Sequence, residues 1–308
     1  MMPNFFAPPK EIDAVAWARL PDALRDARED NARTRGQPSG FPAKAFLERP
    51  SFDREGNLWC VDIINGRLLT IDRNGEFSVA VQYDGWPNGL KIHRDGRVFI
   101  ADYKHGIMVF DRDTREVTPL IERYQMERLK AVNDLFFARN GDLYFTDQGL
   151  TGLHDPTGRL FRYSVDGKLT CLLNNVPSPN GLVMNPEETQ VLLAVTRGNC
   201  VWRVPLTAEG GVSKVGVFVQ MSGGIGPDGL ALDSSGGLII AHVGLGSVWV
   251  MSPAGEPLFR IRSPLGPLTT NMAFGDEGNR QIYITESHSG TILRADLSIP
   301  GKTMYSHV

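Results

Sequence analysis

The stretch "GPDGLALDSSGGLIIAH", residues 226–242, has the pattern of a β-hairpin. A polar turn with two glycines separates two short apolar runs, as in the turns that join antiparallel strands. An acidic residue, Asp228, stands at the start of the first strand, although the rest of that strand is apolar. How this aspartate is interpreted depends on whether the stretch is unique in the chain.

Five further units share this pattern, and their recurrence decides the architecture. The other units are "ERPSFDREGNLWCVD" from Glu48, "NGLKIHRDGRVFIAD" from Asn88, "NDLFFARNGDLYFTD" from Asn133, "NGLVMNPEETQVLLAVT" from Asn180 and "NMAFGDEGNRQIYITE" from Asn271. Their first polar residues are separated by 40, 45, 47, 48 and 43 positions, the length of a four-stranded blade. We therefore predict an all-β fold, a six-bladed β-propeller. An antiparallel sandwich is the alternative, and the polar residue at the start of every unit argues against it.

The first 40 residues lack this period. Ile12, Val15, Ala16 and Leu20 have a roughly helical spacing that Pro21 interrupts. We predict a partly helical N-terminal extension over residues 1–40, which packs on the propeller or forms a homodimer contact, and a catalytic propeller domain over residues 41–308. The outer strand that closes the last blade is assigned to residues 43–48, with the C-terminal "KTMYSHV" as the competing candidate.

Composition limits the class of partner. The formal net charge of −3 provides no basic field for nucleic acid or an anionic membrane. The three cysteines have no CxxC spacing, the N-terminus has no signal-peptide pattern, and no apolar run approaches the roughly 18 residues of a membrane span. We expect a reduced, cytoplasmic protein that acts on a small molecule, with no nucleic-acid or membrane partner.

The propeller topology brings two sets of polar residues to one mouth of the central channel, because the second strand of each blade returns antiparallel to the first. The first strands begin with Glu48, Asn88, Asn133, Asn180, Asp228 and Asn271. The second strands end with Asp62, Asp102, Asp147, Thr196, His242 and Glu286. Partly buried carboxylates are costly unless a cation or hydrogen bonds compensate them.

Four of these positions form a candidate metal site. Glu48, Asn133, Asn180 and Asp228 offer two carboxylates and two amide oxygens. Oxygen ligands suit Ca²⁺ best, and the lack of His or Cys among them disfavours a dedicated Zn²⁺ site, while Mg²⁺ and Mn²⁺ stay open. A turn-forming role for Asn or Asp before Gly is the alternative, and recurrence at the blade period favours the metal.

The motifs "LERPSFD", "VNDLFF", "SPNGLVM" and "GPDGLALD" resemble those of the SMP-30/gluconolactonase/luciferin-regenerating-enzyme family, over roughly residues 42–300. The resemblance implies a six-bladed propeller with lactonases and diisopropyl-fluorophosphatase among its relatives. It also implies one catalytic divalent cation, usually assigned as Ca²⁺, on Glu48, Asn133, Asn180 and Asp228.

Further residues follow from the resemblance. "GDLYFTDQG" is similar to the Thr-Asp stretch of bacterial drug-responsive lactonases, which makes Asp147 a candidate site residue. Asn88 is expected to contact substrate, and Asp134 to orient the metal ligands from behind. Animal sugar lactonases of the family tend to have an arginine where this chain has Ala131, so a less polar lactone or another ester is favoured at least as much as gluconolactone.

The expected reaction is metal-assisted opening of a lactone. The cation would polarise the carbonyl and activate a bound water, and Asp228 or Asp147 would take the proton. Substrate contacts are expected from Asn88, Asn271, His242, His288 and Trp86. The alternative for each histidine is a rim residue bonded to backbone, and for Trp86 a packing residue between blades.

Two other functions remain open from the sequence. A phosphotriesterase-like hydrolase would use the same cation to polarise P=O instead of C=O. A non-catalytic propeller would keep the cation as a structural element and present its faces to a protein partner.

Overall fold

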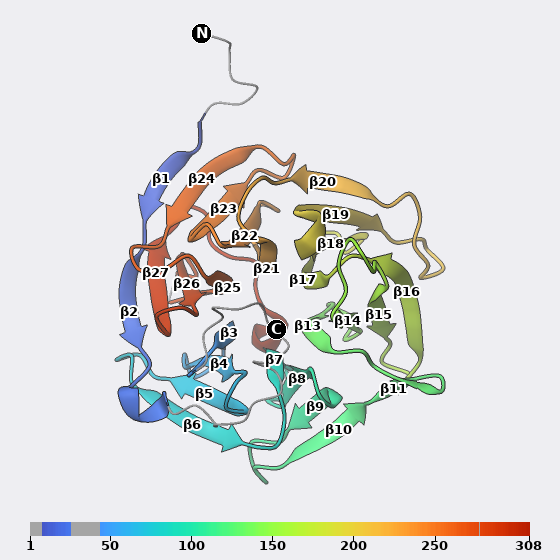
Figure 1. Cartoon of the computed structure of the whole chain (residues 1–308), viewed down its shortest axis with the longest axis horizontal. Coiled ribbons are helices and arrows are strands. Elements are labelled where there is room, and N and C mark those ends of the chain that lie inside the picture. The colour runs from blue at the N-terminus through green and yellow to red at the C-terminus, as the bar shows by residue number, and fades with distance from the viewer. Residues whose placement is uncertain (1–7, 26–43, 277) are drawn as a thin grey trace.

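Six β-sheets surround a central axis in the computed structural model, which describes residues 8–25, 44–276 and 278–308 (Figure 1). The inner strand of each sheet contacts the inner strands of its two neighbours, so the ring is closed. The six-bladed propeller predicted from the repeats is confirmed. Among the described residues, no helix has the length and apolar character that a membrane crossing requires.

Each blade runs from its inner to its outer strand in chain order. The first three blades are β3 (Leu47–Phe52), β4 (Leu58–Asp62), β5 (Arg67–Ile71), β6 (Phe77–Gln82); β7 (Pro87–Ile92), β8 (Val98–Asp102), β9 (Gly106–Phe110), β10 (Val117–Ile121); and β13 (Val132–Phe137), β14 (Leu143–Asp147), β15 (Gly158–Tyr163), β16 (Leu169–Val176). A small hairpin, β11 (Arg123–Tyr124) and β12 (Glu127–Arg128), joins the second blade to the third.

The last three blades follow the same order. They are β17 (Pro179–Met184), β18 (Gln190–Val195), β19 (Cys200–Pro205), β20 (Gly216–Gln220); β21 (Gly226–Leu232), β22 (Leu238–Val243), β23 (Ser247–Met251), β24 (Pro257–Arg262); and β25 (Thr269–Gly275), β26 (Gln281–Glu286), β27 (Thr291–Asp296). The 3₁₀ turn η2 (Thr196–Gly198) connects β18 to β19.

Every inner strand contains a register shift at its polar position. Between Glu48 and Ser51, strand β3 advances three residues while its partner β4 advances two. The other inner strands gain one residue in the same place. A β-bulge re-aims the side chains at the extra residue, so these positions leave the alternation of an ordinary strand.

Glycines let the inner strands approach one another. A Cβ on Gly181 would overlap the carbonyl oxygen of Asp228, and one on Gly229 would overlap the side chain of Asn271. Only glycine avoids these contacts, as we expect where backbones approach closely at the axis.

The N-terminal segment supplies outer strands, which corrects the predicted helical extension. Strand β1 (Lys10–Asp13) pairs in parallel with β24, and β2 (Val15–Arg19) pairs antiparallel with β27 and completes the sixth blade. The only helical element among residues 8–25 is the 3₁₀ turn η1 (Asp22–Leu24). Ala14, Ala18 and Leu20 are buried at even spacing, which suits a strand, and the free edge of β27 offers the backbone partners that a helix would not use.

The predicted boundary at residue 40 therefore does not separate an appendage from the ring, because β1 and β2 belong to the blades. The assigned outer strand of residues 43–48 is also wrong, since Leu47 and Glu48 begin the innermost strand of the first blade. The polar stretch "REDNARTRGQPSG", residues 28–40, which the sequence predicts to be a linker, lies outside the described residues.

The C-terminal segment covers the mouth opposite the bulges, where the inner strands end (Figure 1). The amide of Lys302 donates to the carbonyl of Leu232, and the ring of Tyr305 in η3 (Tyr305–His307) stacks on Phe137 at 5.1 Å. "KTMYSHV" is thus a cover for the channel and not the outer strand that was its competing assignment.

The N-terminal closure has a measurable contribution to stability. We expect Leu20→Ala to lower the free energy of unfolding by about 2–5 kcal/mol, because Leu20 is 1% exposed and packs among side chains of the first and sixth blades. Urea unfolding followed by circular dichroism measures the change. The matched control Val15→Ala, at a position 54% exposed on β2, should change it by less than about 0.5 kcal/mol. Equal effects of the two variants would contradict this account of the closure.

Candidate active site at the axial mouth

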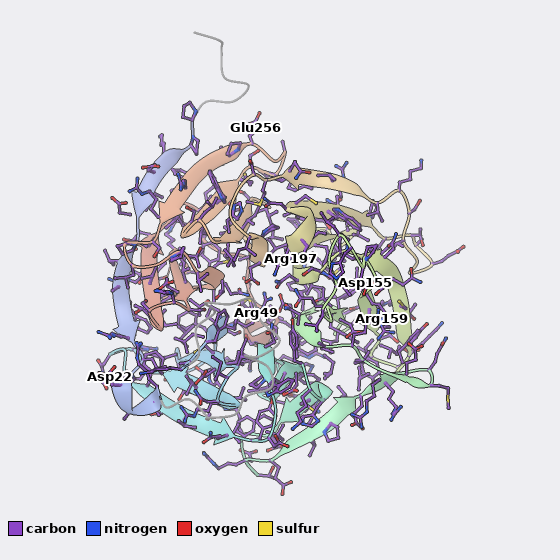
Figure 2. All side chains as sticks on the ribbon, in the orientation of Figure 1. Asp22, Arg49, Asp155, Arg159, Arg197 and Glu256 are labelled. Carbon is purple, nitrogen blue, oxygen red and sulfur yellow. The ribbon has the colours of Figure 1, made fainter. Side chains whose placement is uncertain are left out.

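Four inner strands bring the four predicted metal ligands together around one side chain, the guanidinium of Arg49. Its Nη2 donates to Oδ1 of Asn133 at 2.6 Å and to Oδ1 of Asn180, and lies 3.4 Å from Oδ1 of Asp228. Its Nε lies 3.9 Å from Oε2 of Glu48 without a hydrogen bond. In Figure 2 Arg49 is labelled close to the centre of the ring.

Asp134 holds this guanidinium from behind. Its Oδ2 accepts from Nη1 of Arg49 at 2.9 Å, and its Oδ1 accepts from the amide of Leu135 at 2.7 Å. The sequence predicted that Asp134 would orient the residues at the axis from behind. The group that it contacts directly is an arginine.

Local backbone geometry directs Arg49 inward. Arg49 follows Glu48 in the bulge of β3 and has φ of 51°, in the left-handed region that non-glycine residues seldom adopt. Its side chain is fully buried. Such backbone strain persists only where the surroundings fix the conformation, as the four hydrogen-bonding partners do here.

Burial sets the electrostatics of the cluster. It raises the pKa of Glu48 well above its usual value, with Asp228 adding to the rise and Arg49 opposing it. It raises the pKa of Asp228 to about 6, while the charge of Arg49 lowers it. Asp228 has a side-chain exposure of 11%, against 4% for Glu48 and Asp134, so it is the most accessible carboxylate of the cluster.

The carboxylates at the ends of the second strands have a structural role. Asp62, Asp102, Asp147 and Glu286 accept hydrogen bonds from the backbone amides of Phe46, Trp86, Ala131 and Leu268, which precede or begin the inner strands. The sequence leaves open whether a cation or hydrogen bonds compensate the burial of these carboxylates. In the structure hydrogen bonds do so.

Asp147, one of the two predicted bases, is fully engaged within its blade. Its Oδ2 accepts from Nε of Arg159 at 2.8 Å, and its Oδ1 accepts from the amide of Ala131 at 2.8 Å. The side chain is 0% exposed. This geometry favours Asp228 over Asp147 as the group that meets substrate.

The predicted substrate contacts are divided between the cluster, the core and the rim. Asn88 is buried beside the cluster, and its Nδ2 donates to the carbonyl of Asn133 at 3.2 Å. Asn271 is buried with Oδ1 on the amide of Met272. Trp86 packs partly buried against the core of the first two blades, and His288 is exposed at the rim.

His242 is buried with both ring nitrogens engaged. Its Nδ1 accepts from Nε1 of Trp249 at 3.2 Å, and its Nε2 lies 2.9 Å from the carbonyl oxygen of Gly223, to which it donates. The backbone-bonded alternative considered for the rim histidines describes this arrangement. It leaves no ring nitrogen for a substrate.

Sequence reasoning missed Arg49 and Gln148. Oε1 of Gln148 accepts from Nδ2 of Asn133 at 2.9 Å and from the hydroxyl of Tyr103, and Nε2 donates to Ser178. The sequence does contain a signal for Arg49. In three other units a glycine follows the first polar residue, at Gly89, Gly181 and Gly229, whereas the first unit has an arginine at this position. No repeat signal marks Gln148.

A cavity of about 560 Å³ adjoins the cluster at this mouth. Its walls are Tyr103, Gln148, Ser178, Arg197 and the loop of residues 149–154. Arg197 is exposed on this wall, and its charge lowers the pKa of Asp228 slightly against the larger rise from burial. Leu150 and Leu153 give this wall two exposed apolar side chains.

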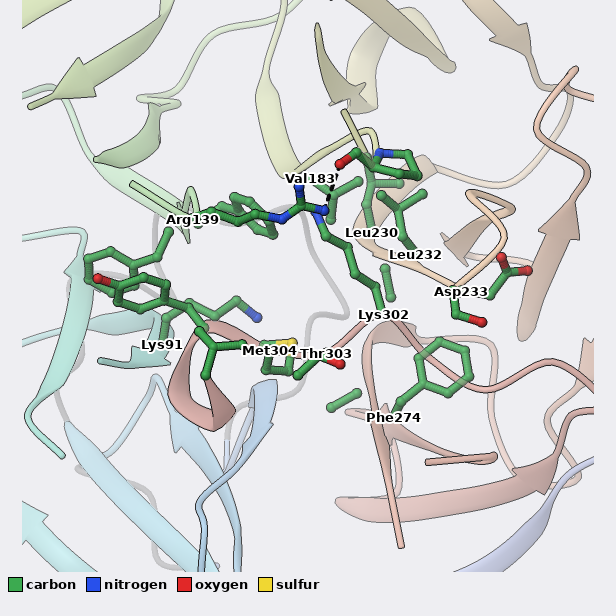
Figure 3. Close-up of a pocket in the computed structure, with 18 of the residues that line it drawn as sticks. Lys91, Arg139, Val183, Leu230, Leu232, Asp233, Phe274, Lys302, Thr303 and Met304 are labelled. Atoms are coloured by element: carbon green, nitrogen blue, oxygen red, sulfur yellow. Dashed lines mark hydrogen bonds between the residues drawn. The ribbon is translucent and has the colours of Figure 1, made fainter. Parts of the chain in front are cut away.

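A second cavity, of about 600 Å³, lies at the opposite mouth beneath the C-terminal segment (Figure 3). Lys91, Leu230, Phe274, Lys302 and Met304 are among its lining residues. Lys91, Leu230 and Phe274 follow the bulges along their inner strands, so this cavity is separate from the Asp228 mouth.

The axial oxygens are the ligands that the predicted divalent cation would need. Carboxylate and amide oxygens are suitable ligands in type. The oxygens of Asn133, Asn180 and Asp228, however, already face the guanidinium of Arg49. Among the described residues, no group of three or more His, Cys, Asp or Glu is placed to hold a metal ion. A divalent cation therefore does not fit this site as it is folded.

His242 gives the fold a pH dependence. Burial lowers the pKa of its ring, so the unfolded chain takes up a proton below about pH 6.5 that the folded protein resists. The stabilisation is complete above about pH 6.5 and is lost as the pH falls towards the folded-state pKa.

We expect the free energy of unfolding of the native protein to fall more steeply between pH 7.5 and 5.5 than that of His242→Gln, by at most about 1.4 kcal/mol per pH unit. Urea titrations at both pH values measure the difference. Equal slopes for the two proteins would show that folding does not oppose protonation of this ring.

Residues 48–288 match the SMP-30/gluconolactonase/LRE-like region. A gluconolactonase of Zymomonas mobilis is 30% identical over 221 residues, which span 66% of this chain and 61% of that protein. A lactonase, drp35, of Staphylococcus aureus is 28% identical over 230 residues, or 71% of this chain and 70% of that protein. The crystal structure of a calcium-binding regucalcin from Agrobacterium tumefaciens has the same fold, with a TM-score of 0.77, 22% identity and coverage of 98% of this chain and 100% of the other. The chain belongs to the SMP-30/gluconolactonase/LRE-like family.

Proposed function

We propose that this chain hydrolyses a lactone at the mouth that carries Asp228. The observation that carries the proposal is the 11% side-chain exposure of Asp228 at this mouth, where Gln148, which bonds to Asn133 of the cluster, lines a cavity of about 560 Å³. Sequence relatives named gluconolactonase and lactonase support the reaction class.

Asp228 is the proposed general base. Its carboxylate takes a proton from a water molecule, the water oxygen attacks the lactone carbonyl, and the ring C–O bond breaks to give a hydroxy acid. Burial raises the pKa of Asp228 to about 6, so it is a stronger base than an exposed aspartate and is mostly ionised at neutral pH. Arg197, exposed on the cavity wall, is placed to stabilise the negative charge that develops on the carbonyl oxygen.

Arg49 and Asn180 position the base. Nη2 of Arg49 lies 3.4 Å from Oδ1 of Asp228 and binds Oδ1 of Asn180. The amide nitrogen of Asn180 donates to Oγ1 of Thr196, which fixes the orientation of this amide. A carboxylate held on one side in this way presents its other face to the mouth.

The divalent cation that the sequence predicts, Ca²⁺ in preference to Mg²⁺, Mn²⁺ or Zn²⁺, would need the oxygens of Glu48, Asn133, Asn180 and Asp228. Three of these residues already engage the guanidinium. The reaction that we propose therefore has no step that depends on a metal.

The proposed substrate is less polar than gluconolactone. Leu150 and Leu153 line the cavity and are 75% and 73% exposed, so an alkyl group of a bound lactone can cover them. From the sequence, Ala131 favours such a substrate at least as much as gluconolactone.

Replacement of the base tests the reaction. We expect Asp228→Asn to lower kcat for lactone opening at least about a hundredfold, because an amide cannot accept the proton. A panel of alkyl, aromatic and sugar lactones, followed by acid release with a pH indicator, measures the loss. Asp147→Asn is the comparison: we expect it to lower the unfolding temperature, since Arg159 loses its buried partner. A selective loss of kcat in Asp147→Asn, with Asp228→Asn fully active, would reverse the assignment.

The apolar wall tests the substrate class. We expect Leu153→Ala to lower kcat/KM for lactones with an alkyl chain by roughly tenfold, from a loss of about 1–2 kcal/mol of apolar contact. The effect on gluconolactone should stay below about twofold, because its hydroxyl groups gain little from this wall. Equal effects on the two substrates would contradict the proposed role of the wall.

A further inference from the structure

We propose that the guanidinium of Arg49 fills the cation position at the axis and that the protein binds no divalent metal there. This inference shares the geometry of Arg49 with the proposed mechanism, and the metal titration below tests it without an activity assay, so its failure is distinguishable from a failure of the proposed lactone hydrolysis. It rests on the geometry of the oxygens, on the anchoring of Arg49 and on the chemistry of the guanidinium.

The oxygens converge on Arg49 as they would on an ion. Nη2 binds side-chain oxygens from the third and fourth blades, those of Asn133 and Asn180, and lies near Asp228 of the fifth. The amide nitrogens of Asn133 and Asn180 donate away from the axis, to Gln148 and Thr196, so both amide oxygens face the guanidinium. The N–O distance of 2.6 Å to Asn133 approaches the roughly 2.3–2.6 Å of a Ca²⁺–oxygen contact.

Arg49 is anchored at both ends of its side chain. Nη1 bonds to Asp134 at 2.9 Å, and the left-handed backbone at φ 51° sets the direction in which the side chain leaves the strand. Moving the guanidinium away would leave the buried carboxylate of Asp134 with backbone amides but without its cation, which is strongly unfavourable.

Arginine also differs in its chemistry from the other cationic side chains, because it does not lose its charge to admit a metal ion. A lysine or histidine can lose a proton and its charge, whereas a guanidinium stays charged at every pH that the fold tolerates. A divalent ion entering beside it would meet a fixed positive charge in a poorly screened interior. The cation and Arg49 therefore exclude each other.

The chain offers a direct test, because Arg49→Gly removes the guanidinium and suits the left-handed backbone. Purified native protein, Arg49→Gly and the double variant Arg49→Gly/Asn180→Ala are dialysed against chelator and then titrated with Mn²⁺. Electron paramagnetic resonance reports the free ion. Thermal unfolding with and without Ca²⁺ provides a second measure, and circular dichroism checks that each protein is folded.

We expect no stoichiometric Mn²⁺ on the native protein and about one bound equivalent on Arg49→Gly. Ca²⁺ should raise the Tm of Arg49→Gly by roughly 2–5 °C and leave that of the native protein unchanged. The double variant should lose both effects, since Asn180 supplies one of the oxygens.

Two results would overturn the proposal. In the first, the native protein binds one equivalent of Mn²⁺, and Asn180→Ala in the otherwise native protein abolishes this binding. That result would show that the metal displaces Arg49. Absence of binding to both folded native protein and folded Arg49→Gly would show that the oxygens form no cation position. If Arg49→Gly does not fold, Arg49→Ala takes its place in the same titration, and the measurement on the native protein keeps its meaning.

Discussion

The buried guanidinium of Arg49 links side chains from four of the six blades. Asn133, Asn180 and Asp228 belong to separate inner strands, and Arg49 itself comes from the first blade. Each of these polar groups would be costly at the axis without a partner. One planar cation with several donors meets the needs of all of them, and the inner strands can therefore carry polar residues at the centre of an otherwise apolar ring.

Two sets of polar residues at the same mouth have different physical roles. The set at the bulges faces the axis and contains the carboxylate that we propose as the base. The carboxylates at the ends of the second strands accept backbone amide hydrogen bonds within their own blades, as Asp147 does from Ala131. A bulge makes this distinction, because it turns the inner-strand side chain out of the regular alternation and towards the axis.

The described segments near the two chain ends, residues 8–25 and 297–308, complete the ring away from the candidate site. Strand β2 closes the sixth blade from outside, and the segment around Tyr305 covers the opposite mouth. The covered end holds a cavity with lysines and apolar side chains, while the end with Asp228 opens beside the loop of residues 149–154. Within the part of the chain that the structure describes, Asp228 therefore lies at the mouth that the C-terminal segment does not cover.

The sequence by itself determined the number of blades, the inner strand of each and the polar residues that meet at one mouth, because these follow from a repeat of fixed period and from the alternation of strands. It also marked Asp228, whose acidic side chain stands at the start of an apolar strand. It did not determine the N-terminal strands, since the even spacing of Ala14, Ala18 and Leu20 competes with a helical one and is decided by the free edge of β27. Only the tertiary structure decided what neutralises the axial oxygens, because the partner of a buried charge depends on which side chains reach it in space. Arg49 reaches them through a left-handed bulge residue, which a linear pattern does not display.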